Sequence, residues 1–277
     1  MFCLDISQKK WIDVKSIDLG RRNVLGRNFY VSIPQDLGVE PAKGYGIGRI
    51  AETHISGESV IGKIGLYEID LRSPVCKLCP AELESVFELR ETWVSRPEIA
   101  LLHELGIAYR VVREIVGSVL VLGESVSSLA MALVAERFGA LVYTLRRKIP
   151  SVKTHQLTIE TWDELRARNI FIGGNLSDEE KLFIEEKLSH ARKAVIYYHP
   201  LMRGSKIALS LGEHLVLKRP RKPLVSPRLL PLASKLFRLA HDKYIYVVRP
   251  GENLPEKMYV VIDFRASPKS EEISSEK

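Results

Sequence analysis

The sequence predicts an α/β fold with a β-rich first part and a doubly wound parallel sheet in the second. Strand-like and helix-like segments alternate between residues 117 and 222, which is the pattern of parallel strands joined by crossover helices. Residues 1–95 instead carry short β-type runs, such as 29–33 and 65–69, separated by glycines and turn residues.

A helix is predicted over residues 97–113. Pro97 is a favoured first-turn residue, and apolar residues follow it at near-helical spacing. The segment ends shortly before the first apolar run of the α/β region, so the two are expected to follow each other directly.

The most informative stretch lies between Gly117 and Lys148. An apolar run at 119–122 ends at Gly123, a segment of small and apolar residues continues to Phe138, and a second apolar run occupies 141–145. A strand, a glycine turn, a helix and a strand within about 30 residues form a dinucleotide-binding βαβ unit, whose phosphates lie at the helix N-terminus.

The glycine fingerprint of this unit is incomplete. The ideal G-x-G-x-x-G would fall on Gly123, Ser125 and Ser128, so only its first glycine is present. Ser125 adds a side chain where the backbone would approach the pyrophosphate, although its hydroxyl could bind a phosphate, and Ser128 is nearly as small as glycine. With Val126, these residues form the predicted phosphate site. A βαβ unit that binds no nucleotide is the alternative.

Three cations follow the second strand. Enzymes that prefer NAD place a carboxylate about 20 residues beyond the glycines, against the ribose hydroxyls. Arg146, Arg147 and Lys148 stand there instead, and they favour the 2′-phosphate of NADP, which Arg146 could bind through two hydrogen bonds. A solvated basic turn is the alternative.

The residues after position 148 also contain patterns typical of helix starts and strands. Ser177 with Glu180, and Thr161 with Glu164, have the spacing of a capping box at a helix start. Further strands are expected at 169–172, 194–198, 214–217, 243–249 and 258–264, with a helix at 232–241 and a disordered tail at 267–277.

Composition excludes several classes of protein. The chain has no apolar run of 18 or more residues and no signal-peptide core, so we expect a cytoplasmic protein that does not interact with membranes. The net charge of +7 favours anionic ligands, but the densest basic cluster, 218–222, is interrupted by proline and lacks aromatic residues. Nucleic acid is therefore not an expected partner. The three cysteines are too few for a disulfide framework and fit a reducing compartment.

Two neighbouring segments together resemble the zinc-dependent medium-chain alcohol dehydrogenase superfamily, nearest its polyol and glucose dehydrogenase branch. Residues 100–112, ALLHELGIAYRVV, are similar to the helix that precedes the Rossmann domain in that branch, and the βαβ unit follows without a gap. The resemblance implies a GroES-like β domain at 1–113, completed by 223–266, with a Rossmann-type nucleotide-binding domain inserted at 114–222.

The catalytic zinc of that family is not expected here. It requires about three protein ligands and a water. Val39 occupies the place of the family's histidine, no cysteine lies between Cys3 and Cys76, and only Glu40 and Glu104 remain.

A structural zinc is not expected either. Cys76 and Cys79 have C-x-x-C spacing, but the other two cysteines of the family's lobe are absent. A pair of free thiols, or a disulfide, is expected in its place.

The resemblance therefore implies a zinc-independent, NADP(H)-dependent oxidoreductase that acts on a small alcohol or carbonyl compound. The candidate catalytic residues are Glu104, His103 and Tyr45, while Tyr197, Tyr198 and His199 end the strand expected near the nicotinamide. Each of these residues could instead have a purely structural role; for His103 this is the role of a histidine packed in the core or exposed on the helix surface. The alternative function is a catalytically silent relative that serves as a nucleotide-binding or interaction subunit. Whether the chain forms a homo-oligomer is left open.

Overall fold

The chain divides into two compact units in the computed structural model. The first contains Met1–Pro34, Pro41–Ala100 and Tyr246–Lys277, and the second contains Gln35–Glu40 and Leu101–Ile245. The structure describes residues 1–17, 23–37, 42–53, 58–82, 85–145, 148–149, 151–157, 169–188, 194–202, 216–218, 220, 223–241, 243–256 and 258–266.

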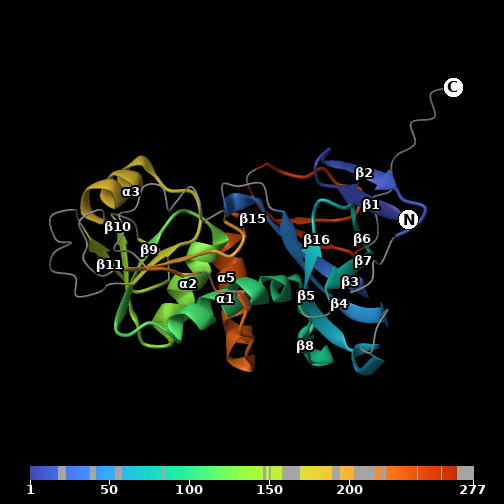
Figure 1. Cartoon of the computed structure of the whole chain (residues 1–277), viewed down its shortest axis with the longest axis horizontal. Coiled ribbons are helices and arrows are strands. Elements are labelled where there is room, and N and C mark those ends of the chain that lie inside the picture. Colours follow the sequence, from blue (N-terminus) through green and yellow to red (C-terminus); the bar gives the residue numbers. More distant parts are fainter. Residues whose placement is uncertain are drawn as a thin grey trace. The chain divides into compact units, whose positions relative to one another are not determined.

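The first unit is built from antiparallel strands, blue to cyan and red in Figure 1. Its main sheet has the order β15-β16-β3-β4-β5-β7, with β8 beside β5, and β3 also pairs with β7. The strands β3, β4, β5 and β7 therefore close into a ring. Their bounds are β3 Asn23–Pro34, β4 Lys43–Thr53, β5 Ile64–Asp70, β7 Leu78–Glu82, β8 Phe87–Leu89, β15 Ile245–Val248 and β16 Tyr259–Asp263.

The glycines of this unit make room for one buried side chain. Tyr67 is 1% exposed, and a Cβ at Gly26, Gly46 or Gly48 would lie only 2.1–2.4 Å from its nearest neighbour, which is Tyr67 or the backbone of β3. The Tyr67 hydroxyl donates a hydrogen bond to Asn28 Oδ1 at 2.7 Å. The glycine-rich β-type runs therefore pack closely around an aromatic core instead of forming loops.

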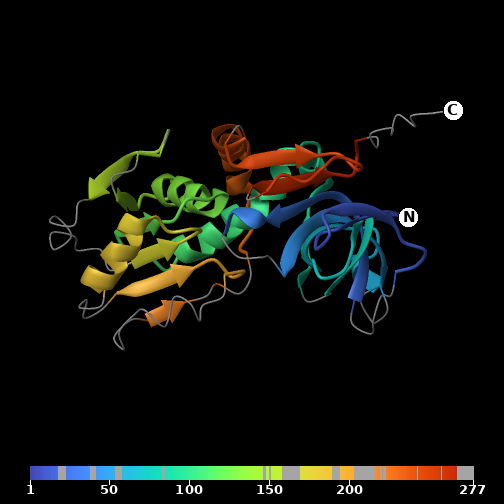
Figure 2. The same ribbon diagram turned by 90° about the horizontal axis from the view of Figure 1, so that it is seen from above.

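The second unit is a six-stranded sheet in which every pairing is parallel, with strand order β11-β10-β9-β12-β13-β14. In Figure 2 these strands lie side by side, from yellow-green through yellow to orange. Numbered within the unit the order is 3-2-1-4-5-6, that of a doubly wound dinucleotide-binding sheet. This confirms the predicted α/β fold class. The strands are β9 Ser118–Leu122, β10 Leu141–Leu145, β11 Thr154–Leu157, β12 Asn169–Ile172, β13 Val195–Tyr198 and β14 Val216–Lys218.

The helices of the second unit begin close to where the sequence predicts them. The segment predicted as a helix at 97–113 is a 3₁₀ turn at Pro97–Leu101 followed by α1 at Leu102–Val112. The Ser177–Glu180 capping box is present at the start of α3, whereas Thr161 and Glu164 lie outside the described residues. The other helix bounds are α2 Val126–Arg137, α3 Asp178–Phe183 and α5 Leu230–Ala240.

The compact units are bounded differently from the predicted domains. Both α1 and α5 cluster with the parallel sheet, whereas the sequence placed residues 97–113 and 223–266 with the β domain. The domain assignment itself stays a prediction, and the tail 267–277 lies outside the described residues.

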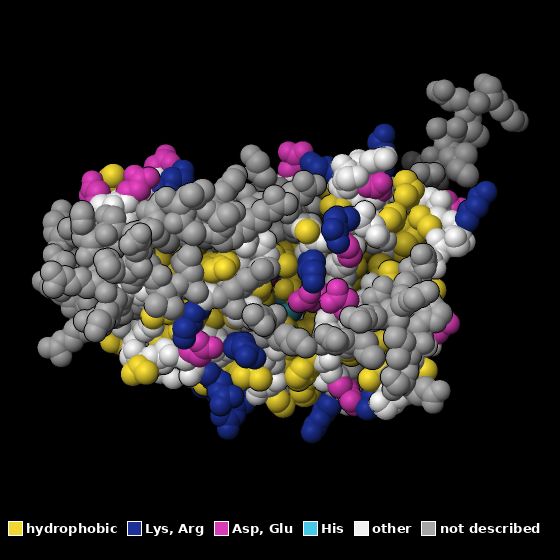
Figure 3. Space-filling model, viewed as in Figure 1, with side chains coloured by type: hydrophobic (Ala, Val, Ile, Leu, Met, Phe, Trp, Pro, Cys, Tyr) yellow, Lys and Arg dark blue, Asp and Glu magenta, His cyan; other side chains and the backbone are white. Residues whose placement is uncertain are grey.

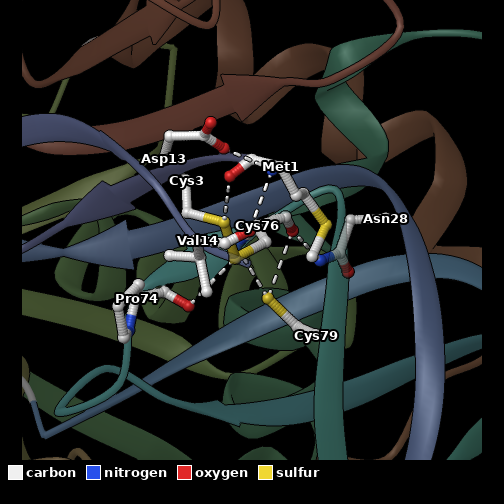
Figure 4. The surroundings of a disulfide bond; sticks show 8 residues. All are labelled: Met1, Cys3, Asp13, Val14, Asn28, Pro74, Cys76 and Cys79. Atoms are coloured by element: carbon white, nitrogen blue, oxygen red, sulfur yellow. Dashed lines mark hydrogen bonds and ion pairs between the residues drawn. A yellow bond between two sulfur atoms is a disulfide. The ribbon is translucent and has the colours of Figure 1, made fainter. Parts of the chain in front are cut away.

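The cysteines are arranged differently from the expectation. Cys3 of β1 (Phe2–Asp5) and Cys76 of β6 (Val75–Cys76) form a disulfide, while Cys79 is a free, buried thiol. Figure 4 shows all three sulfur atoms in one region. The sequence led us to expect free thiols or a disulfide at Cys76 and Cys79, but β1 pairs antiparallel with β6 and sets Cys3 directly opposite Cys76. The pairing of β1 with β6 therefore determines which cysteines form the disulfide, and the C-x-x-C spacing carries no information about that pairing.

The Cys79 thiol is held inside this region. It donates a hydrogen bond to the carbonyl oxygen of Cys76 at 3.1 Å and accepts one from the Cys76 amide at 3.0 Å. Burial raises the pKa of the Cys79 thiol to about 11, against the opposing hydrogen bond with Cys76. The thiol is therefore protonated at neutral pH and is a poor nucleophile.

Candidate functional site

The parallel sheet has a switch point between β9 and β12, where the strand order reverses, and ligands of such sheets bind beyond the strand ends at this point. Gly123 follows β9 there with a φ of 83°. A Cβ at this position would lie 2.7 Å from the Gly174 carbonyl oxygen. Both the backbone conformation and the close packing require glycine here, so the first glycine of the fingerprint is needed for the tight turn.

The two serines in the fingerprint positions bind the protein's own backbone. Ser125 is the N-cap of α2: its hydroxyl accepts a hydrogen bond from the Ser128 amide at 3.1 Å and donates one to the Gly173 carbonyl at 2.7 Å. The Ser128 hydroxyl donates to the Leu122 carbonyl at 3.1 Å. Both side chains are buried. The serines therefore stabilise the turn, and their predicted contact with a phosphate stays a prediction.

Two carboxylates of the chain hold backbone amides around this turn. Asp36 Oδ2 accepts a hydrogen bond from the Val126 amide at 2.7 Å, and Glu180 Oε1 accepts one from the Gly123 amide at 2.9 Å. Val126 is the first residue of α2, so Asp36 places a negative charge at the positive end of the helix, where a phosphate would otherwise bind.

In this position, only one of the two carboxylate oxygens of Asp36 accepts a hydrogen bond from a described residue. It is 5% exposed, and its Oδ1 has no hydrogen-bond partner among the described residues. Burial raises the pKa of Asp36 to about 7; the hydrogen bond from Val126 opposes this effect and the negative charge of Glu104 adds to it. The carboxyl group that caps α2 is thus about half ionised at pH 7.

A second buried cluster is centred on Glu104 of α1. His103 Nε2 lies 3.0 Å from Glu104 Oε1, His199 Nε2 lies 3.1 Å from Oε2, and the Ser127 hydroxyl donates a hydrogen bond to Oε2. All four side chains are at most 2% exposed. Burial by itself would raise the pKa of Glu104, but the attraction of His199 and His103 outweighs it and holds that pKa well below its usual range.

His199 lies close to Glu104, but the two side chains do not have the geometry of a hydrogen bond. Its Nδ1 accepts a hydrogen bond from the Leu201 amide at 3.2 Å, which leaves the proton of a neutral ring on Nε2. That Nε2 has no hydrogen-bond partner with suitable geometry among the described residues, although Glu104 lies at 3.1 Å. Glu104 therefore acts on His199 chiefly through its charge.

The structure brings together part of the predicted catalytic set. His103 and Glu104 meet, and both are wholly buried. Tyr45 lies in β4 of the first unit and is also buried. Ser127 and Asp36 were missed, because their contacts join segments far apart in sequence, and only the position of His199 at the end of a predicted strand pointed to the cluster.

Other predicted site residues fall elsewhere. Lys148 is exposed, while Arg146, Arg147, Val39 and Glu40 lie outside the described residues. Among the residues that the structure does describe, no group of three His, Cys, Asp or Glu side chains could hold a metal ion. No helix in this part of the chain is long and apolar enough to span a membrane.

Comparison with known proteins identifies the fold. No family model and no curated protein matches the sequence. Among solved structures, CAD from Helicobacter pylori complexed with NADP(H) matches 96% of this chain and 98% of its own, at 12% identity and a TM-score of 0.56. Escherichia coli K-12 YhdH with bound NADPH matches 95% and 99%, at 10% identity and a TM-score of 0.54.

A third match is a putative NADPH:quinone reductase from Mesorhizobium loti, with 92% of this chain and 90% of its own covered, at 15% identity and a TM-score of 0.56. The chain has the fold of the medium-chain dehydrogenases and reductases. Identities this low establish the fold alone.

A dinucleotide bound to this medium-chain dehydrogenase fold would compete with carboxylates of the chain itself. The pyrophosphate would lie at the N-terminus of α2, where the Val126 amide is held by Asp36 and the Gly123 amide by Glu180. Binding at the Val126 amide therefore requires that Asp36 be neutralised or displaced.

Proposed function

We propose that this chain is an NADP(H)-dependent oxidoreductase that acts on an alcohol or carbonyl compound without zinc. The observation that carries the proposal is the turn from β9 through Gly123 into α2, which keeps its positive φ and its tight packing at the switch point of the sheet. The same fold occurs in structures solved with NADP(H). The cofactor would supply the hydride chemistry, and the protein would orient the substrate.

In this proposal the residues have separate roles. Backbone at Gly123, Ser125, Val126 and Ser128 would approach the pyrophosphate, and the cluster 146–148 would bind the 2′-phosphate. Preference for NADP over NAD rests on that cluster.

Glu104 and His103 are too deeply buried to touch a substrate where they stand. Glu104 would therefore act indirectly, through the charge that it presents to His199, while the catalytic role of Tyr45 stays a prediction.

A second candidate is the catalytically silent relative, and one observation favours it. Asp36 and Glu180 already hold the amides of Val126 and Gly123. If these contacts are permanent, the chain supplies its own anions in place of a cofactor and retains the fold for another purpose, such as binding a partner. On the face seen in Figure 3, lysine and arginine side chains are scattered among acidic and apolar ones over the described residues, which does not favour nucleic acid as that partner.

Titration of metal-analysed protein with NADPH and NADH, followed by nicotinamide fluorescence at pH 6.5, tests both candidates. The oxidoreductase should bind NADPH at micromolar concentration and NADH more weakly. Arg146→Asp should weaken NADPH binding by about 1.5–3 kcal/mol and spare NADH, because the charge-assisted contact exists only with the 2′-phosphate. Binding of neither nucleotide, by the wild type or by Asp36→Asn, would support the silent relative.

A further inference from the structure

A pocket of about 180 Å³ opens on the first unit where β3 changes its neighbour. The first half of β3 pairs with β7 and the second half with β16. At the change, the Asn28 amide donates to the Lys77 carbonyl at 2.7 Å, and the Phe264 amide donates to the Phe29 carbonyl at 3.0 Å. The start of β7 and the end of β16 thus form the two arms of a fork, and the pocket lies between them.

The lining of this pocket is basic. Its charged side chains are Arg27, Arg49, Lys77 and Arg265, and no carboxylate from the described residues lines it. Arg27 of β3 and Arg49 of β4 stand directly opposite each other in the register of the two strands. Like charges in that relation destabilise a sheet, so this arrangement is unfavourable for the sheet alone.

Most of this charge is not neutralised. Arg49 pairs with Glu91 at 2.5 Å, but Arg265 donates to the Val94 carbonyl at 2.7 Å and to the Tyr30 hydroxyl at 3.2 Å, which are uncharged. The side chains of Arg27 and Lys77 make no ion pair or hydrogen bond with any other described residue. Three cations therefore converge on the pocket without a counter-charge from the described part of the chain.

An adjoining pocket of about 380 Å³ has a different character. It shares Phe29 and Arg265 with the basic pocket and is lined beyond them by the apolar Ile64 and Val94 and by the polar Glu91, Thr92 and Ser95, with Glu91 paired to Arg49. A ligand with an anionic end and an uncharged, partly apolar body would fit both parts at once, since small-molecule sites combine apolar walls with a few convergent polar groups.

We propose that the two pockets together bind a small phosphate monoester. The phosphate would lie among Arg27, Lys77 and Arg265, and the uncharged part would pack against Phe29, Ile64 and Val94. A phosphate monoester carries about two negative charges at neutral pH, which matches three uncompensated cations better than a single carboxylate does. A guanidinium group can donate two parallel hydrogen bonds to two phosphate oxygens at once. The site uses residues of the first unit only and does not depend on the function proposed above.

Calorimetric titration of the full chain with phenyl phosphate and with inorganic phosphate tests this proposal. Phenyl phosphate should bind the wild type, and the double variant Arg27→Gln/Lys77→Gln should bind it at least tenfold more weakly. Lys10→Gln is the matched control, because Lys10 is an exposed lysine on β2 (Lys10–Asp13) that lies outside the pocket and has no ion pair with any described residue; this variant should bind as the wild type does.

A separate substitution tests the adjoining pocket. Thr92 lines it and is exposed, so Thr92→Trp should fill it without disturbing the core. We expect this variant to bind phenyl phosphate no more tightly than inorganic phosphate. Equal binding of phenyl phosphate by the wild type and the double variant, or no binding by the wild type, would overturn the proposal.

Discussion

The pH dependence of NADPH binding is the sharpest test of the role of Asp36. Its carboxylate caps the Val126 amide at 2.7 Å, and the charge that faces it from α1 is that of Glu104. If only the neutral form of Asp36 lets the pyrophosphate approach, the apparent Kd is the intrinsic Kd divided by the fraction of that form.

The magnitude follows from the pKa of Asp36, which burial raises to about 7. The apparent Kd should be about 2-fold above its intrinsic value at pH 7, about 11-fold at pH 8 and about 100-fold at pH 9. Asp36→Asn is neutral throughout and should bind NADPH with nearly constant affinity over this range. Asp178→Asn changes an exposed carboxylate on α3 and should follow the wild type.

The assay is nicotinamide fluorescence at constant ionic strength, with titrations at pH 6.5, 7, 8 and 9. A wild-type Kd that does not change with pH, or an Asp36→Asn variant with the same slope as the wild type, would refute the competition between Asp36 and the pyrophosphate. Absence of binding at every pH in both proteins would instead argue against the oxidoreductase.

Three further predictions concern stability. Because the folded-state pKa of Asp36 is raised from 3.8 to about 7, the wild type should lose stability as pH rises from about 4 to about 7 and level off above that, so the advantage of Asp36→Asn in urea denaturation should grow by up to about 4 kcal/mol between pH 4 and pH 8; a constant difference would contradict the burial of this carboxylate. Glu104→Gln should destabilise by about 1–3 kcal/mol at pH 7 in the same assay, since it replaces a buried carboxylate that accepts a hydrogen bond from Ser127 and lies beside His103 and His199, and a loss below about 0.5 kcal/mol would show that the cluster is not coupled. The contribution of Glu104, whose folded-state pKa is lowered, should be present above its usual value of 4.5 and disappear only as pH falls below it. Cys3→Ser should cost about 4 kcal/mol, because the Cys3–Cys76 bond closes a loop with a sequence separation of 73; its melting temperature should no longer respond to reductant, whereas Cys79→Ala should still respond.

The sequence by itself determined the features that depend on near neighbours. The strand, turn and helix around Gly123 follow from an apolar run, a residue that must adopt positive φ and a capping serine, all within a few positions. The capping box at Ser177 is likewise complete within four residues. Such signals are legible because the hydrogen bonds that they describe close within one turn of helix.

Only the tertiary structure decided which distant groups meet. The C-x-x-C spacing indicated Cys76 and Cys79, but the pairing of β1 with β6 selected Cys3 as the partner of Cys76. Asp36 lies 90 positions before the amide that it caps. No local pattern encodes such a contact, because its formation depends on the order of strands in the sheet and on the packing of helices against it. The fold class was therefore readable from the sequence, whereas the carboxylate that caps α2 beside the predicted phosphate site was not.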